Sequence, residues 1–232
     1  MKKYSEFLSH MRLFNGLDSE VLADISVRLR ELRAKKGAVL FRKEMEGTVL
    51  YIIHEGAVKI VLRSKLGDEI ILNIFSKGDM FGEMSLLDGR PRSSDAIAVK
   101  PSKLLLLNRN DFMNLLRQHD SVKETLIGAL AVRLRKTEGL MEDTSFLNIP
   151  ARFAKKLIDL GETFGRRRGN ALEINLRLTQ NDLANIVGAT RETINKELRI
   201  LREKGLVSTM DKVIRIHNVE RLKNQVSLNK FV

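Results

Sequence analysis

The spacing of apolar residues divides the chain into a helical start, a strand-rich middle and a mostly helical second half. Residues 4–34 carry apolar side chains at roughly helical spacing, which predicts two short helices with a break at Gly16. From residue 38 to residue 108 the pattern changes to short apolar runs separated by Gly37, Gly47, Gly56, Gly67 and Gly78. Short strands with a turn signal about every 8 to 12 residues predict a sandwich or a barrel-like roll.

The next segment has the pattern of a long helix. Ser121 and Glu124 have the spacing of a capping box, which predicts that the helix begins there. The stripe that follows has intervals of 3, 4, 3 and 4 residues and consists of Ile127, Leu130, Leu134, Thr137 and Met141. A stripe this narrow favours packing against a second identical helix, and therefore a homodimer. The alternative is that the stripe packs against the chain's own strands.

A break and a basic segment follow this helix. Phe146 to Pro150 is predicted to interrupt it, because proline disfavours helix at the residue before it. Residues 151–164 then have the period of an amphipathic helix. Residues 165–170 contain three consecutive arginines and are interpreted as a basic surface loop.

Residues 178–198 have the spacing of a helix-turn-helix. Thr179 is suited to cap a first helix and Thr190 a second, with Gly188 in the turn between them. The apolar residues expected to bury one face of each helix are Leu183, Ile186, Val187, Ile194, Leu198 and Leu201. Two short apolar runs after Gly205 predict a hairpin, so the motif is expected to be winged.

The second helix of this motif carries the candidate base-reading residues. In such folds the N-terminal end of this helix meets base edges in the major groove. Arg191 can bond guanine at O6 and N7, Glu192 can accept from a cytosine amino group, and Lys196 adds a point charge. A solvated charged face is the alternative. Candidate phosphate contacts are Gln180, Asn181, Thr190, Thr193 and, at the tip of the predicted hairpin, Lys212.

Residues 81–94, FGEMSLLDGRPRSS, concentrate candidate ligand chemistry between two predicted strands. Arg92, the adjacent Ser93 hydroxyl and free backbone N–H groups would make a good phosphate cradle. Gly82 lets the backbone approach a ligand closely, and Glu83 can only accept hydrogen bonds, which suits a sugar hydroxyl. The segment therefore predicts a pocket for one ribose-phosphate unit. A hairpin with a solvated Arg–Glu pair is the alternative.

The order Gly-Glu-Met-Ser-Leu-Leu-Asp-Gly-Arg-Pro-Arg-Ser-Ser closely resembles the phosphate-binding cassette of cyclic-nucleotide-binding domains. The resemblance implies that Glu83 holds the ribose 2′-hydroxyl and that Arg92 holds the cyclic phosphate. It also implies that the remaining ligand contacts come from Gly82, Met84, Ser85 and Ser93.

With the long helix and the helix-turn-helix, almost the whole chain resembles the CRP/FNR superfamily of transcription regulators. In that family a threonine at the position of Thr137 reaches the nucleotide base at the dimer interface. Glu138 replaces the small hydroxyl or amide residue that is usual at the next position, which leaves the identity of the base open. Related regulators use the region of residues 165–170 to contact RNA polymerase, so polymerase is an expected partner.

Composition argues against several other classes of protein. The 232 residues include no cysteine, which excludes disulfides, cysteine nucleophiles and cysteine-ligated iron–sulfur clusters. His54 is the one histidine among the predicted strands, whereas metal enzymes of similar architecture need clustered histidines, so no metal site is expected. The sequence contains no run of about 18 or more apolar residues, so no membrane span or signal peptide is expected. A cytoplasmic location fits these features.

The net charge of +12 and the pI of about 10.0 predict an anionic partner, with double-stranded DNA first. Residues 149–232 hold 17 Lys/Arg against 9 Asp/Glu, so this smaller part carries +8 and the rest +4. The basic excess therefore lies where the helix-turn-helix is predicted.

We expect an α+β protein that is not an enzyme. Its predicted parts are a cyclic-nucleotide-binding jelly roll (a double-stranded β-helix) at 1–120, a dimerisation helix with hinge at 121–148, and a winged helix-turn-helix domain at 149–232. We expect a homodimeric, sequence-specific transcription regulator. A cyclic nucleotide, with cyclic AMP as the first candidate, is expected to orient its two helix-turn-helix motifs on a near-palindromic operator. The alternatives are a regulator of the same fold with another ligand such as cyclic di-GMP or with none, a nucleotide-controlled enzyme subunit, and a nonspecific DNA-compacting protein.

Overall fold

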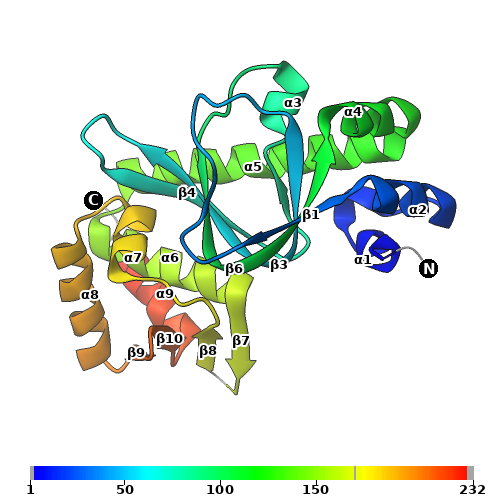
Figure 1. Ribbon diagram of the computed structural model, residues 1–232. Coiled ribbons are helices and arrows are strands. Elements are labelled where there is room, and N and C mark those ends of the chain that lie inside the picture. Colours follow the sequence, from blue (N-terminus) through cyan, green and yellow to red (C-terminus); the bar gives the residue numbers. More distant parts are fainter. Residues whose placement is uncertain (1–2, 170, 229–232) are drawn as a thin grey trace. The chain divides into compact units, whose positions relative to one another are not determined.

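The computed structural model describes residues 3–169 and 171–228, and the chain divides into two compact units, Met1–Arg135 and Lys136–Val232. The first unit is built around a strand-rich roll, and the second around helices with a small sheet (Figure 1). The predicted α+β class is confirmed.

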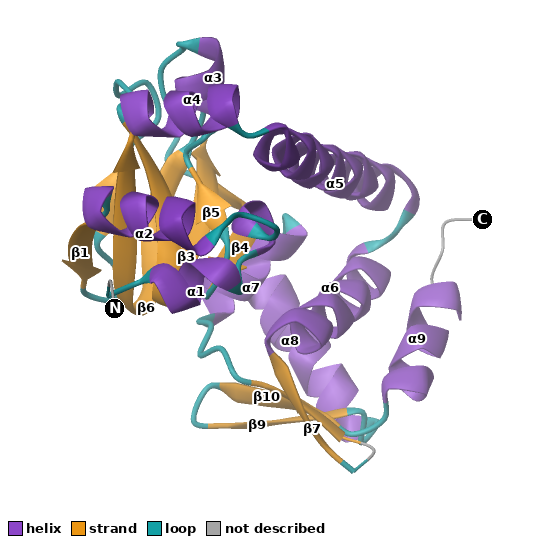
Figure 2. Ribbon diagram, turned by 90° about the vertical axis from the view of Figure 1, so that its right-hand side faces the viewer, coloured by secondary structure: helices purple, strands orange, loops and turns teal. Residues whose placement is uncertain are grey.

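The chain begins with short helices that cover the roll. These are α1 (Ser5–Ser9), the 3-10 turn Arg12–Phe14 and α2 (Ser19–Arg28), and they lie across the strands in Figure 2. The prediction of helix as far as residue 34 is wrong, because Arg30–Ala34 forms strand β1 and pairs antiparallel with a later strand. Long-range pairing therefore overrides the local helical pattern at the end of this segment.

The roll is a sheet of six strands in which two long strands form the centre. Its members after β1 are β2 (Val39–Phe41), β3 (Val49–Arg63), β4 (Glu69–Ser76), β5 (Met80–Phe81) and β6 (Asp95–Asn108). The order is β1-β6-β3-β4, with β2 added on β6 and β5 on β3. The apolar runs on the two sides of Gly56 are one strand, β3, and the apolar residues that follow the cassette form one unbroken strand, β6.

Gly56 explains why β3 looked like two strands. It has a φ of 105°, but the strand continues through it, with register irregularities against β6 on both sides. A Cβ at Gly56 would lie 2.1 Å from the Ser102 hydroxyl, so the glycine permits close contact between strands. The residue marks a bend in a continuous strand, which is a known role of strand glycines.

The first unit has a core on each side of its strands. One cluster joins the N-terminal helices to β3, β6 and the helices that follow, with Leu8, Phe14 and Phe112 fully buried. The other lies among the strands and is aromatic, with Phe41, Tyr51, Phe75 and Phe81. The cassette lies between β5 and β6, beside this aromatic cluster.

Two helices complete the first unit, α4 (Arg109–Gln118) and the long α5 (Asp120–Phe146), which continues into the second. The predicted capping box does not form, because α5 begins at Asp120 and Ser121 is already helical. Val122 and Leu126 are buried in the roll's core, and Leu130 packs against it. Ile127, Leu134 and Met141 stay 66%, 61% and 69% exposed.

The second unit begins with α6 (Ile149–Phe164) and contains a four-stranded sheet. The sheet order is β7 (Gly165–Arg168), β8 (Ala171–Ile174), β10 (Val213–Ile216), β9 (Val207–Met210). The predicted loop at 165–170 is therefore a strand as far as Arg168, and Asn170 lies outside the described residues. Helices α7 (Gln180–Val187), α8 (Arg191–Glu203) and α9 (Val219–Leu228) complete the unit, and α9 was not foreseen.

No helix in the described part of the chain is both long and apolar enough to cross a membrane.

Candidate functional site

The cassette folds as a strand end, a short helix and a turn. Strand β5 ends at Phe81, Gly82 follows with a φ of 82°, and Glu83 precedes the helix α3 (Met84–Asp88). Gly89 ends this helix in the left-handed conformation, with a φ of 71°. Left-handed backbone is available to glycine at little cost, so both turns follow directly from the sequence.

Arg92 is the charged centre of the cassette and is only 3% exposed. Its Nη1 donates to the Gly82 carbonyl at 2.6 Å and its Nη2 to the Val49 carbonyl at 2.8 Å. Its guanidinium carbon lies 4.3 Å from the centre of the Phe41 ring. Its Nε is buried and has no hydrogen-bond partner among the described residues. Burial lowers the pKa of Arg92, because the charged guanidinium loses contact with water. An anion beside the guanidinium would act in the opposite direction and favour the charged form.

Two glycines make room for this arginine. A Cβ at Gly82 would lie 2.6 Å from Arg92 Nη1, and one at Gly47 would lie 2.4 Å from the Ser85 Cβ and 3.0 Å from Arg92 Cζ. The loop before β3 is also tied to the arginine's backbone, because Arg92 N–H donates to the Met45 carbonyl at 2.8 Å. The backbone thus surrounds the guanidinium closely on two sides.

Glu83 is the acidic member of the site and is 2% exposed. Its Oε1 accepts a short hydrogen bond from Nη1 of Arg133, which comes from α5. Nη2 of Arg133 donates to the Met80 carbonyl, and the guanidinium carbon of Arg133 lies 4.7 Å from the centre of the Phe75 ring. The second carboxylate oxygen, Oε2, is buried and has no hydrogen-bond partner among the described residues.

Aromatic rings pack beside the charged groups of Arg92 and Arg133. Tyr51 stacks on Phe81 with centroids 5.1 Å apart, and Phe75 stacks on Phe81 at 6.0 Å. Phe41 lies 5.5 Å from Tyr51 at an angle of 48°. Both arginines of the site therefore face aromatic rings, an arrangement that stabilises a desolvated cation.

The remaining residues predicted for the ligand are placed differently. Ser85 is 3% exposed, whereas Met84 is 51% exposed. Ser93 is exposed, with its hydroxyl 3.8 Å from the Met84 sulfur. Thr137 and Glu138 are exposed on α5 and belong to the second unit, so their part in a ligand site stays a prediction.

Sequence reasoning missed Arg133, Phe41 and Gly47. Arg133 precedes Thr137 by four residues on the predicted helix, so both lie on one helix face, and that spacing was a usable signal. The roles of Phe41 and Gly47 depend on contacts across the fold, with Arg92 and Ser85, and no local pattern indicates them.

The helix-turn-helix forms as predicted. The Thr179 side chain accepts from the Asp182 N–H and the Asp182 side chain accepts from the Thr179 N–H, which is a complete capping box at α7. Gly188 ends α7 with a φ of 70°, and the Thr190 hydroxyl accepts from the Thr193 N–H at the start of α8. Leu198 and its neighbours on that face of α8 are buried.

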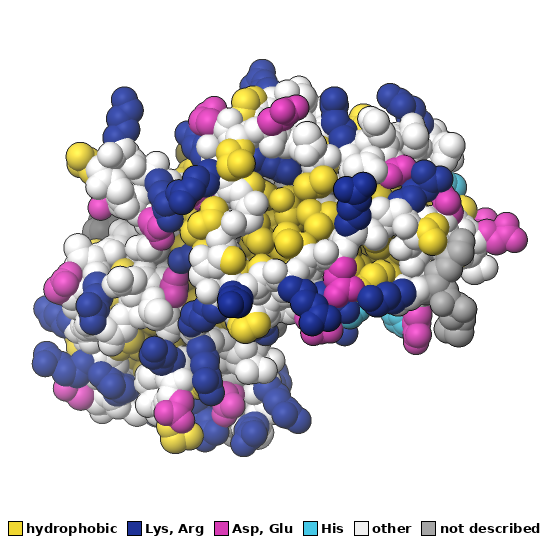
Figure 3. All heavy atoms as spheres, viewed as in Figure 1, with side chains coloured by type: hydrophobic (Ala, Val, Ile, Leu, Met, Phe, Trp, Pro, Cys, Tyr) yellow, Lys and Arg dark blue, Asp and Glu magenta, His cyan; other side chains and the backbone are white. Residues whose placement is uncertain are grey.

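The candidate base readers on α8 are solvent-exposed side chains. Arg191, Glu192 and Lys196 are exposed, and Arg191 Nε lies 3.3 Å from the Gln180 side-chain oxygen. Asn181 is exposed as well. Figure 3 shows Lys and Arg side chains spread over the visible surface of the second unit.

Lys212 lies at the tip of the β9–β10 hairpin, as predicted, and is exposed. Asp211 and Lys212 have φ values of 50° and 64°, which is the left-handed backbone of a tight two-residue hairpin turn. Such a turn holds the lysine at a fixed place at the end of the hairpin.

Within the described residues, no three His, Cys, Asp or Glu side chains gather where they could hold a metal ion. The His54 ring contacts the rings of Tyr4 and Phe7, with centroids 5.3 and 4.6 Å away.

Comparison with known proteins gives a consistent result. Residues 31–119 match the cyclic nucleotide-binding domain family, and residues 151–225 match the Crp-like helix-turn-helix domain family. A regulator from Mycobacterium tuberculosis described as a CRP-like cAMP-activated global transcriptional regulator is 34% identical over 94% of this chain and 97% of its own length. The anaerobic regulatory protein of Bacillus subtilis is 30% identical over 82% of this chain and 79% of its own.

Among solved structures, the c-di-GMP-responsive regulator CLP of Xanthomonas campestris has the same fold, with a TM-score of 0.76 at 21% identity over 87% of this chain and all of that one. The nucleotide-binding model matches the unit that buries Arg92 and Glu83, and the helix-turn-helix model matches the unit that exposes Arg191. With full-length relatives above 30% identity, the chain belongs to the CRP/FNR family of transcription regulators.

Proposed function

We propose that the chain is a homodimeric, sequence-specific DNA-binding regulator whose roll binds a cyclic nucleotide, with cyclic AMP as the first candidate. The observation that carries this proposal is a pair of unsatisfied charged groups in the cassette, Arg92 Nε and Glu83 Oε2. A buried polar atom without a partner costs about 1–3 kcal/mol, and more when it is charged. A ligand with an anionic phosphate and a neighbouring hydroxyl would satisfy both.

The assignment of roles follows from hydrogen-bond chemistry. An arginine can only donate, so Arg92 suits the phosphate oxygens. An ionised carboxylate can only accept, so Glu83 suits a ribose hydroxyl, with Arg133 holding its other oxygen. The backbone N–H groups of Gly82 to Ser85, and Ser93 beside Arg92, would complete the phosphate contacts. Thr137, with Glu138 after it, would place the base.

The proposed dimer interface is the exposed stripe of α5. Ile127, Leu134 and Met141 repeat every seven residues and are each more than half exposed. Seven-residue repeats of apolar side chains favour a paired helix. The alternative predicted from the sequence was that the stripe packs against the chain's own strands. This applies to Leu130, which packs against the roll. A second copy of α5 is therefore the occupant we propose for the remaining face.

Dimer geometry would then set the DNA site. Two recognition helices α8 related by a two-fold axis would read half-sites about one helical turn, ~34 Å, apart. Arg191, Glu192 and Lys196 would contact base edges, while Gln180, Asn181, Thr190, Thr193 and Lys212 would contact phosphates. The operator would therefore be near-palindromic. Such a regulator acts by binding rather than catalysis, in the cytoplasm where the chromosome is.

RNA polymerase is a further proposed partner. Arg166, Arg167 and Arg168 are exposed along β7, at the edge of the sheet. An exposed edge strand with consecutive arginines offers both charge and unpaired backbone groups to a protein surface. Loss of transcription activation without loss of DNA affinity in an Arg167→Ala variant would support this contact.

A second ligand hypothesis rests on a specific observation. Two carbonyls and the Phe41 ring already hold the Arg92 guanidinium, so the site is partly satisfied without an anion. A regulator of this fold that needs no ligand, or that binds cyclic di-GMP, would also be compatible with that arrangement.

Calorimetric titration of the purified protein with cyclic AMP, cyclic GMP and cyclic di-GMP tests the proposal. We expect saturable binding of one cyclic mononucleotide and a loss of about 10–100-fold in affinity for Arg92→Ala, because a charge-assisted hydrogen bond is worth about 1.5–3 kcal/mol. Arg90→Ala, an exposed arginine in the same turn, is the matched control and should bind normally. Equal affinity of the two variants, or no binding by the wild type, would contradict the proposal.

A further inference from the structure

Two exposed methionines lie in the segments that surround Arg92. Met84 is the first residue of α3 and is 51% exposed, and Met45, in the loop between β2 and β3, is 52% exposed. The sequence contains no cysteine, so thioether sulfur is the only sulfur that the chain can oxidise. An exposed thioether is open to oxidation by peroxides, and the sulfoxide that forms is polar. The cassette therefore carries redox chemistry that nucleotide binding itself does not use.

The sulfur of Met84 contacts a residue that is proposed to bind the phosphate. The Ser93 hydroxyl donates a hydrogen bond to Met84 Sδ at 3.8 Å. Ser93 follows Arg92 directly, and its hydroxyl has a single proton to donate. Thioether sulfur is a weak acceptor, so the hydroxyl can turn from the sulfur to a phosphate oxygen at little cost. The chemical state of the sulfur therefore affects how easily Ser93 reaches a ligand.

Packing does not account for a methionine at this position. The buried residues of α3 are Ser85 and Leu86, and Met84 is not one of them. Met80, four residues earlier, is 5% exposed and belongs to the hydrophobic core. A core methionine fills space among apolar neighbours, whereas solvent reaches the side chain of Met84.

We propose that Met84 is a modification site at which oxidation to the sulfoxide weakens nucleotide binding. The proposal rests on the proposed nucleotide-binding function of the roll. In the reaction, a sulfur lone pair attacks one oxygen of hydrogen peroxide and the O–O bond breaks. The proton on the transferred oxygen passes to the departing hydroxide, which leaves as water. The sulfur loses two electrons and the peroxide gains them, so no further reactant is needed.

The sulfoxide changes the phosphate cradle in two ways. Its oxygen is a stronger acceptor than thioether sulfur, so it holds the Ser93 hydroxyl that the phosphate would otherwise receive. The same oxygen carries partial negative charge, which opposes an anion bound at Arg92. Loss of one neutral hydrogen bond corresponds to a loss of about 3- to 10-fold in affinity. The change is reversible, because methionine sulfoxide reductases remove the oxygen.

Calorimetric titration of the full-length protein with cyclic AMP and cyclic GMP, before and after mild treatment with hydrogen peroxide, tests the proposal. Each variant is its own reference, so the readout is the ratio of its two affinities. We expect the wild type to lose about 3- to 10-fold and Met84→Leu, with a similar apolar volume, to keep the affinity that it had before treatment. Met45→Leu removes an equally exposed methionine of the same unit and should stay as sensitive as the wild type.

Peptide mass spectrometry of the treated protein locates the oxygen. Cleavage after Lys77 and Arg92 releases one peptide that contains both Met80 and Met84, so the buried methionine is an internal control. We expect the added mass of one oxygen atom on Met84 and none on Met80. Treatment with methionine sulfoxide reductases should remove the oxygen and restore nucleotide affinity, which a protein damaged elsewhere would not regain.

Unchanged affinity of a wild type that carries the sulfoxide at Met84 would overturn the proposal while leaving the nucleotide site intact. Peroxide sensitivity that persists in Met84→Leu, or that Met45→Leu abolishes, would also overturn it. The same holds if Met84 stays unoxidised while Met210, which is 75% exposed, is oxidised. An untreated wild type that binds no cyclic nucleotide would overturn the proposed function, and this proposal with it.

Discussion

Gly82 shows how a single residue without a side chain sets the chemistry of the cassette. Its carbonyl accepts from Arg92, and its missing Cβ leaves room for the same guanidinium. The positive φ adds a second requirement for glycine, independent of crowding. The two requirements can be separated by experiment, because other glycines of the roll have only one of them.

For Gly82→Ala we expect a loss of stability together with a loss of nucleotide binding, because the methyl group would lie 2.6 Å from Arg92 Nη1. The matched control is Gly78→Ala, which has a φ of 88° but no atom within 4 Å of the added methyl group. Both changes carry a backbone cost of about 1–2 kcal/mol, measurable by urea denaturation. Only Gly82→Ala should displace the guanidinium, so unchanged nucleotide affinity in this variant would contradict the site.

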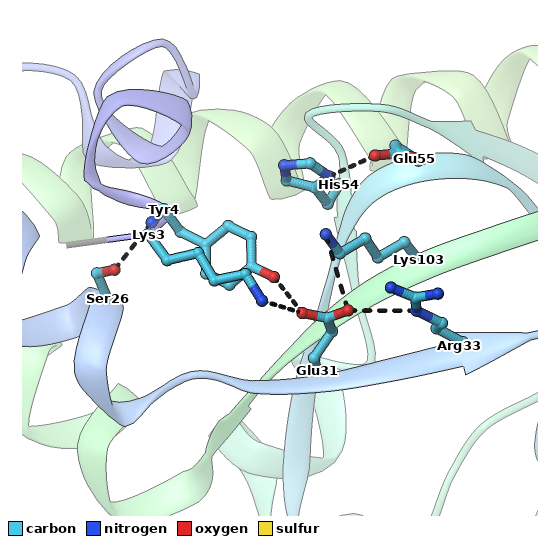
Figure 4. Close-up of polar contacts among 8 residues, drawn as sticks. All are labelled: Lys3, Tyr4, Ser26, Glu31, Arg33, His54, Glu55 and Lys103. Atoms are coloured by element: carbon cyan, nitrogen blue, oxygen red, sulfur yellow. Dashed lines mark hydrogen bonds and ion pairs between the residues drawn. The ribbon is translucent and has the colours of Figure 1, made fainter. Parts of the chain in front are cut away.

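Glu31 is the residue with the clearest pH dependence in the structure. Figure 4 shows it among Lys3, Tyr4, Arg33 and Lys103, at the point where the N-terminal segment meets the roll. Hydrogen bonds from Lys3 and Tyr4 lower the pKa of Glu31 from 4.5 to about 2. A carboxyl whose folded-state pKa is depressed stabilises the fold above its unfolded pKa and loses that contribution as the pH falls.

The wild-type protein should therefore lose stability between about pH 4.5 and pH 2, and Glu31→Gln should lose less over that range. Urea midpoints at several acidic pH values measure this difference. Glu46→Gln removes an exposed carboxylate of the same unit and serves as the control for net charge. Parallel curves for the wild type and Glu31→Gln would show that this contact does not contribute.

At the scale of elements, α5 serves two surfaces at once. Val122, Leu126 and Arg133 contact the roll, whereas the stripe of Ile127, Leu134 and Met141 is exposed. Such a division explains why one member of the predicted dimer stripe, Leu130, packs against the roll instead of remaining exposed. The low exposure of the first set and the high exposure of the second follow from their different angles around the helix.

Leu134→Glu tests the exposed stripe, because a charge at the centre of a paired-helix seam would be desolvated without a partner. We expect the variant to be monomeric by light scattering at concentrations where the wild type is dimeric, with its circular dichroism unchanged. Leu66→Glu changes a residue that is 92% exposed in the β3–β4 turn and should remain dimeric. A dimeric Leu134→Glu protein would place the interface elsewhere.

The helix-turn-helix could be read from sequence because its determinants are local. Thr179, Gly188 and Thr190 act within three or four residues of their own positions, so capping and turn rules identify them. The roll was harder, because Gly56 looked like a turn although β3 continues through it. The partners of Glu83 and Arg92 come from α5 and β2, which lie far along the chain, so the residue types were predicted but the contacts were not.

For the whole molecule, the two units carry their basic residues in different environments. The second unit exposes arginines and lysines on α8 and β7, whereas the first buries one arginine against aromatic rings. An exposed basic surface attracts any nucleic acid, in a way that falls steeply with salt. A buried arginine selects a small anion. We therefore expect nucleotide binding in one unit to change specific operator binding by the other more than it changes nonspecific binding.

The most direct test is the operator affinity of the full-length protein at physiological salt, measured by fluorescence anisotropy with and without cyclic AMP and against random DNA. We expect the nucleotide to raise operator affinity by about 5- to 150-fold, with little effect on random DNA, and Arg92→Ala to abolish the increase. Equal operator affinity with and without every cyclic nucleotide that binds would contradict this expectation.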